Sequence, residues 1–178
     1  MSYQFVKRFK VGDLFDVTLG KPIEKNLQKD DGLIPVVTAK TTDNGVDCYV
    51  NEVIEGQTYE NLMTMTNRGQ GGVTRYHFGK FVLGQNTILF EPKCWEEHYD
   101  QNVYLYLASV LNKLPYGDGY TNYPTKTSIV KDEIQLPVDI NGEPDWNYMR
   151  KYITVGGGQF YRRIWNWLKK EYPFSKNL

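Results

Sequence analysis

The stretch QNVYLYLASVLNKL, residues 101–114, marks the point at which the chain changes from a strand pattern to a helix pattern. Its apolar side chains recur every three or four positions and share one face of a 3.6-residue repeat: Val103, Leu107, Val110, Leu111 and Leu114. Asp100 or Asn102 can cap the start of this segment, and Pro115 ends it. The sequence therefore predicts a helix over residues 101–114.

Before this helix, the first 95 residues carry a strand-and-turn pattern, because short apolar, β-branched and aromatic runs alternate with Gly, Asn, Asp and Pro. The predicted strands are Ile34–Ala39, Val46–Val50, Leu62–Thr66, Val73–Phe78 and Thr87–Glu91. Asn44-Gly45 and Asn67-Arg68-Gly69 predict turns, since Asn and Gly tolerate a positive φ. Val11–Val17 fits either a short helical turn or a strand.

After the helix, Ser128–Val138 is expected to return to the sheet as extended chain, and Asp145 opens a second helix that Gly156-Gly157-Gly158 breaks. A third helix follows, with Phe160 on its apolar stripe and Pro173 at its end. Strands first and helices later predict an α+β fold: a twisted, mostly antiparallel sheet with hairpins, packed by a few helices, with helices at the C-terminal end. We expect the main domain over residues 1–153 and a C-terminal helix over residues 154–178, for internal packing or partner docking.

Composition and charge narrow the class of protein. The 178 residues are 40% hydrophobic, 15% aromatic and 24% charged, which suits one globular domain with a core. No apolar run approaches the roughly 20 residues that cross a bilayer, and the MSYQFVKRFK start has no apolar stretch behind its basic residues, so we expect a cytoplasmic protein. The 21 basic and 21 acidic residues exclude a uniformly basic nucleic-acid binder. They alternate in blocks of sign along the chain, which can either build one positive face or merely reflect loops and helix ends.

Motifs for catalysis, metals and cofactors are sparse. A zinc site would have to use all of the Cys and His residues, which lack CxxC spacing: Cys48, His77, Cys94 and His98. Gly69–Thr74 starts like a phosphate-binding glycine loop but has Thr74 in the final glycine position, and it is better interpreted as a hairpin tip. Glu91-Pro92-Lys93 is the only ExK, and no Asp lies between residues 61 and 90 to complete a nuclease set. By elimination the chain is expected to be a binding module without catalytic residues, metal or cofactor.

Several short stretches follow one another in a fixed order: Val11–Val17, Ile34–Ala39, Asp43–Val46, Asn67–Gly72, Tyr76 with Gly79–Phe81, Lys126–Ser128, and Leu136–Val138 with Asn141–Trp146. Each is weak alone, but the ordered set spans about residues 9–153, and the last stretch is the most distinctive. Together they resemble the target-recognition domain of type I restriction–modification specificity subunits. Similar domains also occur in single-chain restriction–methylation enzymes.

The resemblance implies a fold and a function. Such domains read a few base pairs of double-stranded DNA, mostly in the major groove, and perform no chemistry. Two of them usually alternate with long helices that hold two methyltransferase subunits, and a nuclease subunit can join. This sequence has one such domain and a short C-terminal helix, which fits a half-subunit that pairs with itself, a fragment or a stand-alone relative. A pair of copies about a twofold axis would read a symmetric site.

Polar side chains on and near the predicted turns are the candidates for DNA contacts, because Arg matches guanine, Asn and Gln match adenine, and Lys, Ser and Thr reach phosphates. The candidates are Lys21, Lys40, Thr41, Thr42, Asn44, Asn67, Arg68, Gln70, Arg75, His77, Tyr123, Thr125, Lys126 and Ser128. For Asn44 and Asn67 the alternative is simply to hold a positive φ, and for Tyr123 it is packing. The candidates for partner docking, with internal packing as the alternative, are Phe160, Ile164, Trp165 and Leu168.

Three functions follow from these patterns. The first is sequence-specific DNA recognition that positions a methyltransferase and a nuclease. The second is a DNA-cleaving enzyme fragment, for which Glu91 and Lys93 are the only candidate site. The third is a structural or antagonist protein that binds the methyltransferase without DNA.

Overall fold

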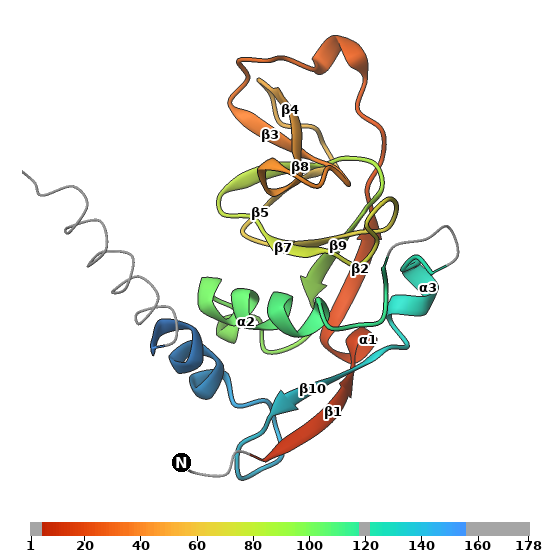
Figure 1. Ribbon diagram of the computed structural model, residues 1–178. Helices are drawn as coiled ribbons and strands as arrows, with labels where there is room; N and C mark the ends of the chain where they lie inside the picture. Colours follow the sequence, from red (N-terminus) through yellow and green to blue (C-terminus); the bar gives the residue numbers. More distant parts are fainter. Residues whose placement is uncertain (1–4, 118–121, 156–178) are drawn as a thin grey trace, which may run out of the picture.

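The computed structural model describes residues 5–117 and 122–155. The strands are β1 (Val6–Lys10), β2 (Phe15–Leu19), β3 (Ile34–Val37), β4 (Val46–Val50), β5 (Thr58–Glu60), β6 (Met63–Thr66), β7 (Thr74–Tyr76), β8 (Lys80–Leu83), β9 (Thr87–Pro92) and β10 (Glu133–Pro137) (Figure 1). The α-helices are α1 (Val11–Leu14), α2 (Gln101–Leu111) and α3 (Lys126–Ile129), and residues 146–155 are also helical. Short 3-10 turns are η1 (Lys25–Leu27), η2 (Asp43–Gly45) and η3 (Glu96–His98).

The strands form three small sheets, with the orders β2-β9-β6-β7, β4-β3-β8-β5 and β1-β10. All neighbouring strands are antiparallel except β3 and β8, which are parallel. The predicted α+β class and mainly antiparallel pairing are confirmed. The single predicted sheet is divided, because β8 and β9 are consecutive in the chain but belong to different sheets. The turn between them therefore ties the two four-stranded sheets together.

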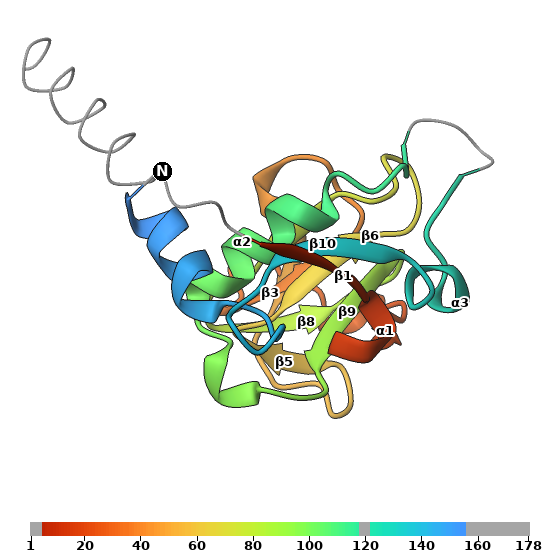
Figure 2. The ribbon, with the colours of Figure 1, turned by 90° about the horizontal axis from the view of Figure 1, so that it is seen from below.

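The main core lies between the β2-β9-β6-β7 sheet and α2, with α1, β10 and the helix at residues 146–155 closing its sides. In Figure 1, α2 runs between that sheet above and the β1–β10 ribbon below. Figure 2 shows the same ribbon crossing the lower end of the molecule. Val103, Leu107 and Leu111 are fully buried, as the 3.6-residue pattern predicted. Burying side chains of this size contributes about 1.5–3 kcal/mol each relative to exposure.

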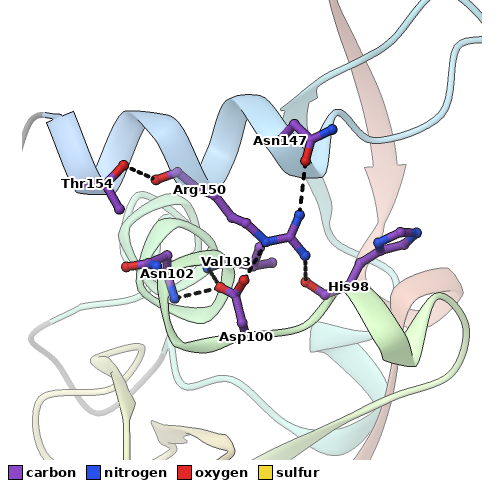
Figure 3. Close-up of polar contacts among 7 residues, drawn as sticks. All are labelled: His98, Asp100, Asn102, Val103, Asn147, Arg150 and Thr154. Carbon is purple, nitrogen blue, oxygen red and sulfur yellow. Dashed lines mark hydrogen bonds and ion pairs between the residues drawn. The ribbon is translucent and has the colours of Figure 1, made fainter.

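Polar contacts fix the start of α2 and the helix at residues 146–155 to each other. Asp100 accepts hydrogen bonds from the backbone N–H groups of Asn102 and Val103 at 2.9 and 3.1 Å, which confirms it as the cap. Arg150 pairs with the same carboxylate and donates to the His98 carbonyl oxygen at 2.8 Å (Figure 3). Next to these Arg150 contacts, the buried Trp146 ring stacks on His98. The C-terminal part of the described chain is thereby attached to the core.

Some predicted elements differ from the observed ones. β1, β5 and β8 were not predicted, and Val11–Val17 contains both α1 and part of β2. Ser128–Val138 was predicted as extended chain, but its first residues belong to α3, because a hydroxyl cap closes a helical turn there. The 101–114 helix ends at Leu111, four residues before Pro115. The third helix and the glycine break lie outside the described residues. No helix in the described ranges is long and apolar enough to span a membrane.

Candidate nucleic-acid interface

Four loops converge on one end of the two four-stranded sheets. Backbone hydrogen bonds link them: Gly20 N–H to the Thr87 carbonyl oxygen at 2.9 Å, Gly84 N–H to that of Val37 at 2.8 Å, and Asn67 N–H to that of Asn86 at 3.0 Å. We call this surface the loop edge, and it comprises residues 20–21, 38–45, 67–73 and 84–86. Segments distant in the sequence are thus held at fixed positions relative to one another.

The 38–45 turn presents most of the candidates that lie before the β6–β7 hairpin. Asn44 has φ 53° and Gly45 has φ 85°, which confirms the turn predicted from that pair. Gly45 N–H donates to the Thr42 carbonyl oxygen at 2.8 Å. Thr41, Thr42 and Asn44 are exposed, whereas the half-buried Lys40 pairs with Asp43 at 3.0 Å. The hydrogen bonds from Lys40 and then Thr42 hold the pKa of Asp43 below its ordinary value.

The same turn is fastened to β7. Arg75 donates to the Thr41 carbonyl oxygen at 3.4 Å, and the Asn44 amide donates to that of Tyr76 at 3.3 Å. His77, which was a candidate for DNA contact, is buried, with 5% of its surface exposed. Its ring contacts Asn44 on one side and Thr64 on the other, so it joins the 38–45 turn to strand β6.

The β6–β7 hairpin tip is shaped by a buried hydroxyl. Thr66 Oγ1 accepts from the Val73 N–H at 3.1 Å and donates to the Gln70 carbonyl oxygen. Arg68 and Gln70 are exposed at the tip. The positive φ predicted for this turn occurs at Gly69, at 64°, and not at Asn67, whose backbone instead bonds the β8–β9 turn.

The loop at residues 122–128 adjoins the hairpin tip. The Arg68 guanidinium lies 5.3 Å from the centre of the Tyr123 ring. A Cβ on Gly71 would lie 2.8 Å from the same ring, so only glycine permits this approach. Thr125 and Ser128 form a capping box at the start of α3, with their side-chain oxygens accepting backbone N–H groups at 3.0 and 2.9 Å. Their hydroxyls are engaged locally, while Lys126 is exposed.

The structure thus brings most of the sequence candidates together. Those on the loop edge or its margin are Lys21, Lys40, Thr41, Thr42, Asn44, Asn67, Arg68, Gln70 and Arg75, and those on the adjoining loop are Tyr123, Thr125, Lys126 and Ser128. The docking candidates Phe160, Ile164, Trp165 and Leu168 lie outside the described residues.

Sequence reasoning missed the residues that position the hairpin. Asn112, just past α2, accepts from the Thr74 N–H at 2.6 Å and donates to the Thr74 carbonyl oxygen at 3.1 Å. This side chain thereby mimics a neighbouring strand at the edge strand β7. Thr64 and Thr66 are buried; the Thr64 hydroxyl bonds His77, and the Thr66 hydroxyl bonds the hairpin tip. Alternation of Thr with Met in β6 is the only sequence signal for them.

The alternative site around Glu91 has a cross-strand acidic partner. The β2–β9 register places Asp16 opposite Glu91. Lys93 Nζ lies 3.5 Å from Asp16 Oδ1 and donates to the Gly12 carbonyl oxygen at 3.1 Å, while Thr18 donates to Glu91 at 3.1 Å. Within the described parts of the chain, no three His, Cys, Asp or Glu side chains come together as a metal site.

Comparison with known proteins places the fold. A family model described as the type I restriction modification DNA specificity domain matches residues 5–155. The specificity subunit S.BcgI of a type II restriction enzyme from Heyndrickxia coagulans is 28% identical over 150 residues, covering 82% of this chain and 42% of that protein. A putative type I specificity subunit from Mycoplasma pneumoniae is 32% identical over 82 residues, covering 46% of this chain and 22% of its own.

Solved structures agree on the fold. The S subunit of a type I restriction–modification system from M. genitalium superposes with a TM-score of 0.67 at 15% identity, covering 97% of this chain and 46% of that one. The HsdS subunit from Thermoanaerobacter tengcongensis gives a TM-score of 0.60 at 14% identity, covering 86% and 37%. The chain spans less than half the length of each of these relatives.

Proposed function

This chain belongs to the family of type I restriction–modification DNA specificity domains, and on that premise we propose that its loop edge recognises a short sequence of double-stranded DNA. The observation that carries the proposal is the convergence of the 38–45 turn and the β6–β7 hairpin tip at one end of the sheets. The β8–β9 turn lies between them and bonds the backbone of Val37 on one side and Asn67 on the other. A rigid set of polar loops loses little conformational freedom on binding, which favours discrimination between sequences.

The exposed side chains divide by chemistry. Arg68 and Gln70 at the hairpin tip have donors and acceptors that match base edges. Asn44 on the neighbouring turn offers its amide oxygen as an acceptor, because its amide nitrogen contacts Tyr76 and His77. Lys21 and Lys126 are exposed and have no side-chain partner among the described residues, so they are suited to phosphates. Lys40 must first leave Asp43 before it can bind a phosphate, and its contribution to DNA affinity is therefore smaller.

We further propose that the chain has no catalytic activity and acts beside a methyltransferase subunit that modifies the recognised site. A nuclease subunit joins the same assembly. Two copies of the chain, or one copy with a second recognition domain, read the two halves of the target. The division into a recognition domain at 1–153 and a C-terminal helix at 154–178, for packing or partner docking, stays a prediction, as does the cytoplasmic location.

A selection from random duplexes tests the proposal. The protein is immobilised, a random pool of short duplexes is passed over it, and bound duplexes are sequenced over repeated rounds. We expect one short sequence to be enriched, with affinity that falls steeply as salt concentration rises. Equal affinity for every duplex, or affinity that does not change with salt, contradicts DNA recognition. Co-purification of a methyltransferase with equal yield in the presence and absence of the selected duplex, with no duplex retained, would favour the antagonist function instead.

A further inference from the structure

We propose that His77 is a positioning residue for DNA recognition: its ring joins Asn44 to Thr64 and fixes the 38–45 turn against the β6–β7 hairpin. The proposal about DNA rests on the proposed function, whereas the contact itself can be tested without DNA.

The geometry assigns a direction to each hydrogen bond. The Asn44 amide nitrogen lies 3.4 Å from His77 Nδ1, and His77 Nε2 lies 2.8 Å from Thr64 Oγ1. Because the same amide nitrogen also donates to the Tyr76 carbonyl oxygen, it acts here as a donor. His77 Nδ1 must therefore accept, and its proton lies on Nε2 and is donated to Thr64.

The surroundings of His77 keep its ring neutral, with the proton on Nε2. Thr64 is 2% exposed, His77 is 5% exposed, and the Phe81 ring packs 4.9 Å from the imidazole centre. Burial, with the nearby charge of Arg75, lowers the pKa of His77 to about 4, so the ring is neutral at physiological pH. A neutral ring with one donor and one acceptor can serve both neighbours, whereas a protonated ring cannot accept from Asn44.

The 38–45 turn needs such an anchor. Asp43, Asn44 and Gly45 have consecutive positive φ values of 52°, 53° and 85°. Asp and Asn adopt this conformation readily as single residues, but two of them in succession need surroundings that hold them there. Two other side-chain contacts join the turn to β7: the partly exposed Arg75 donates to the Thr41 carbonyl oxygen at 3.4 Å, and Asn44 donates to that of Tyr76 at 3.3 Å. His77 is the buried and rigid attachment, and Asn44 is the exposed residue whose orientation it sets.

The first arm of the test needs no DNA. In the full chain, NMR measures hydrogen exchange of the Gly45 N–H, which donates to Thr42 within the turn, and the 15N shifts of the His77 ring. His77→Phe fills the space beside Phe81 and removes both hydrogen bonds. We expect Gly45 exchange to rise up to about 10-fold, the effect of losing one neutral hydrogen bond. His77→Asn retains an acceptor in the place of Nδ1 and should restore slow exchange.

Two further variants separate positioning from packing. Thr64→Val removes the acceptor for Nε2, so His77 should shift toward the tautomer with its proton on Nδ1 and release Asn44. Tyr59→Phe is the matched control, because Tyr59 packs on the same Phe81 ring but hydrogen-bonds Gly56 instead. It should change neither the Gly45 exchange nor the tautomer. Unchanged exchange in folded His77→Phe and Thr64→Val overturns the inference whatever the DNA result.

The second arm uses duplex from the selection. We expect His77→Phe and Thr64→Val to lower the ratio of affinities for selected and scrambled duplex up to about 10-fold, with an unchanged salt slope, because no phosphate contact is removed. An unchanged ratio in variants whose turn is released overturns the role of His77 in recognition. If the parent itself prefers no duplex, the proposed function fails, and the first arm still decides whether His77 holds the turn.

Discussion

Replacing Arg68 by Ala removes the exposed guanidinium of the loop edge and gives the sharpest expectation for DNA binding. In the free protein Arg68 lies over the Tyr123 ring at 5.3 Å and donates to the Asn67 carbonyl oxygen at 2.9 Å. An exposed cation–π contact is worth about 0.5–1 kcal/mol, so the variant should stay folded and lose only about 1–4 °C of thermal midpoint. A loss of DNA affinity in this folded variant then reports the contacts that Arg68 makes with DNA.

The loss at the interface depends on what Arg68 contacts. A two-bond contact to guanine is worth about 1–3 kcal/mol, or roughly 5- to 150-fold in affinity, for the selected duplex alone. A phosphate contact instead weakens all duplexes alike and lowers the salt slope by about 0.9. Arg68→Lys separates the two, because Lys keeps the charge and loses the planar fork. Fluorescence anisotropy across a salt series measures both. Parental affinity and slope in both variants would refute the assignment of Arg68 to the DNA surface.

Three further predictions concern the body of the domain. Burial acts to raise the pKa of Asp100, but hydrogen bonds from Arg150 and the backbone outweigh it and hold the pKa below its ordinary value. The charged form therefore stabilises the fold above about pH 4, and this stability is lost as pH falls through the lower folded pKa. In urea unfolding, the free energy of unfolding should fall less on acidification in Asp100→Asn than in the parent. Asn112→Ala leaves both backbone groups of Thr74 unpaired and should cost about 1–2 kcal/mol, whereas Asn112→Asp, which keeps the acceptor, should lose less, as read from denaturant midpoints. Supercoiled DNA incubated with Mg²⁺ should stay intact with the parent and with Glu91→Ala alike; cleavage by the parent that Glu91→Ala abolishes would establish the nuclease alternative.

The sequence predicted those elements that bury one regular face. The 3.6-residue spacing located α2, and its Val103, Leu107 and Leu111 are fully buried. β1 was not predicted because four of its five residues are exposed, so its sequence shows no alternation of buried apolar and exposed polar side chains. β8 has three consecutive buried residues, which gives a continuous apolar run too short to distinguish from a turn.

The backbone conformation of the loop edge was predictable where neighbouring residues favour a positive φ. Asn44-Gly45 adopts the positive φ that its residues favour, and the turn forms between the two strands that flank it. The ring contact of His77 with Asn44 joins residues 33 positions apart, and the Asn112–Thr74 pair spans 38 positions. No local pattern encodes such pairs, because they depend on which strands become neighbours.

The hydroxyl groups show why residue type alone could not separate DNA contacts from supports. Thr125 and Ser128 were candidates for phosphates, yet their side chains satisfy backbone groups at the start of α3. Thr66 does the same within the hairpin tip. A short polar side chain next to unpaired backbone groups forms hydrogen bonds with them and not with a ligand, since an unsatisfied buried group costs about 1–3 kcal/mol. The longer side chains of Arg68 and Gln70 extend beyond the backbone they stand on. Base recognition should therefore depend on these long side chains, while the hydroxyl groups beneath them fix the positions from which they reach.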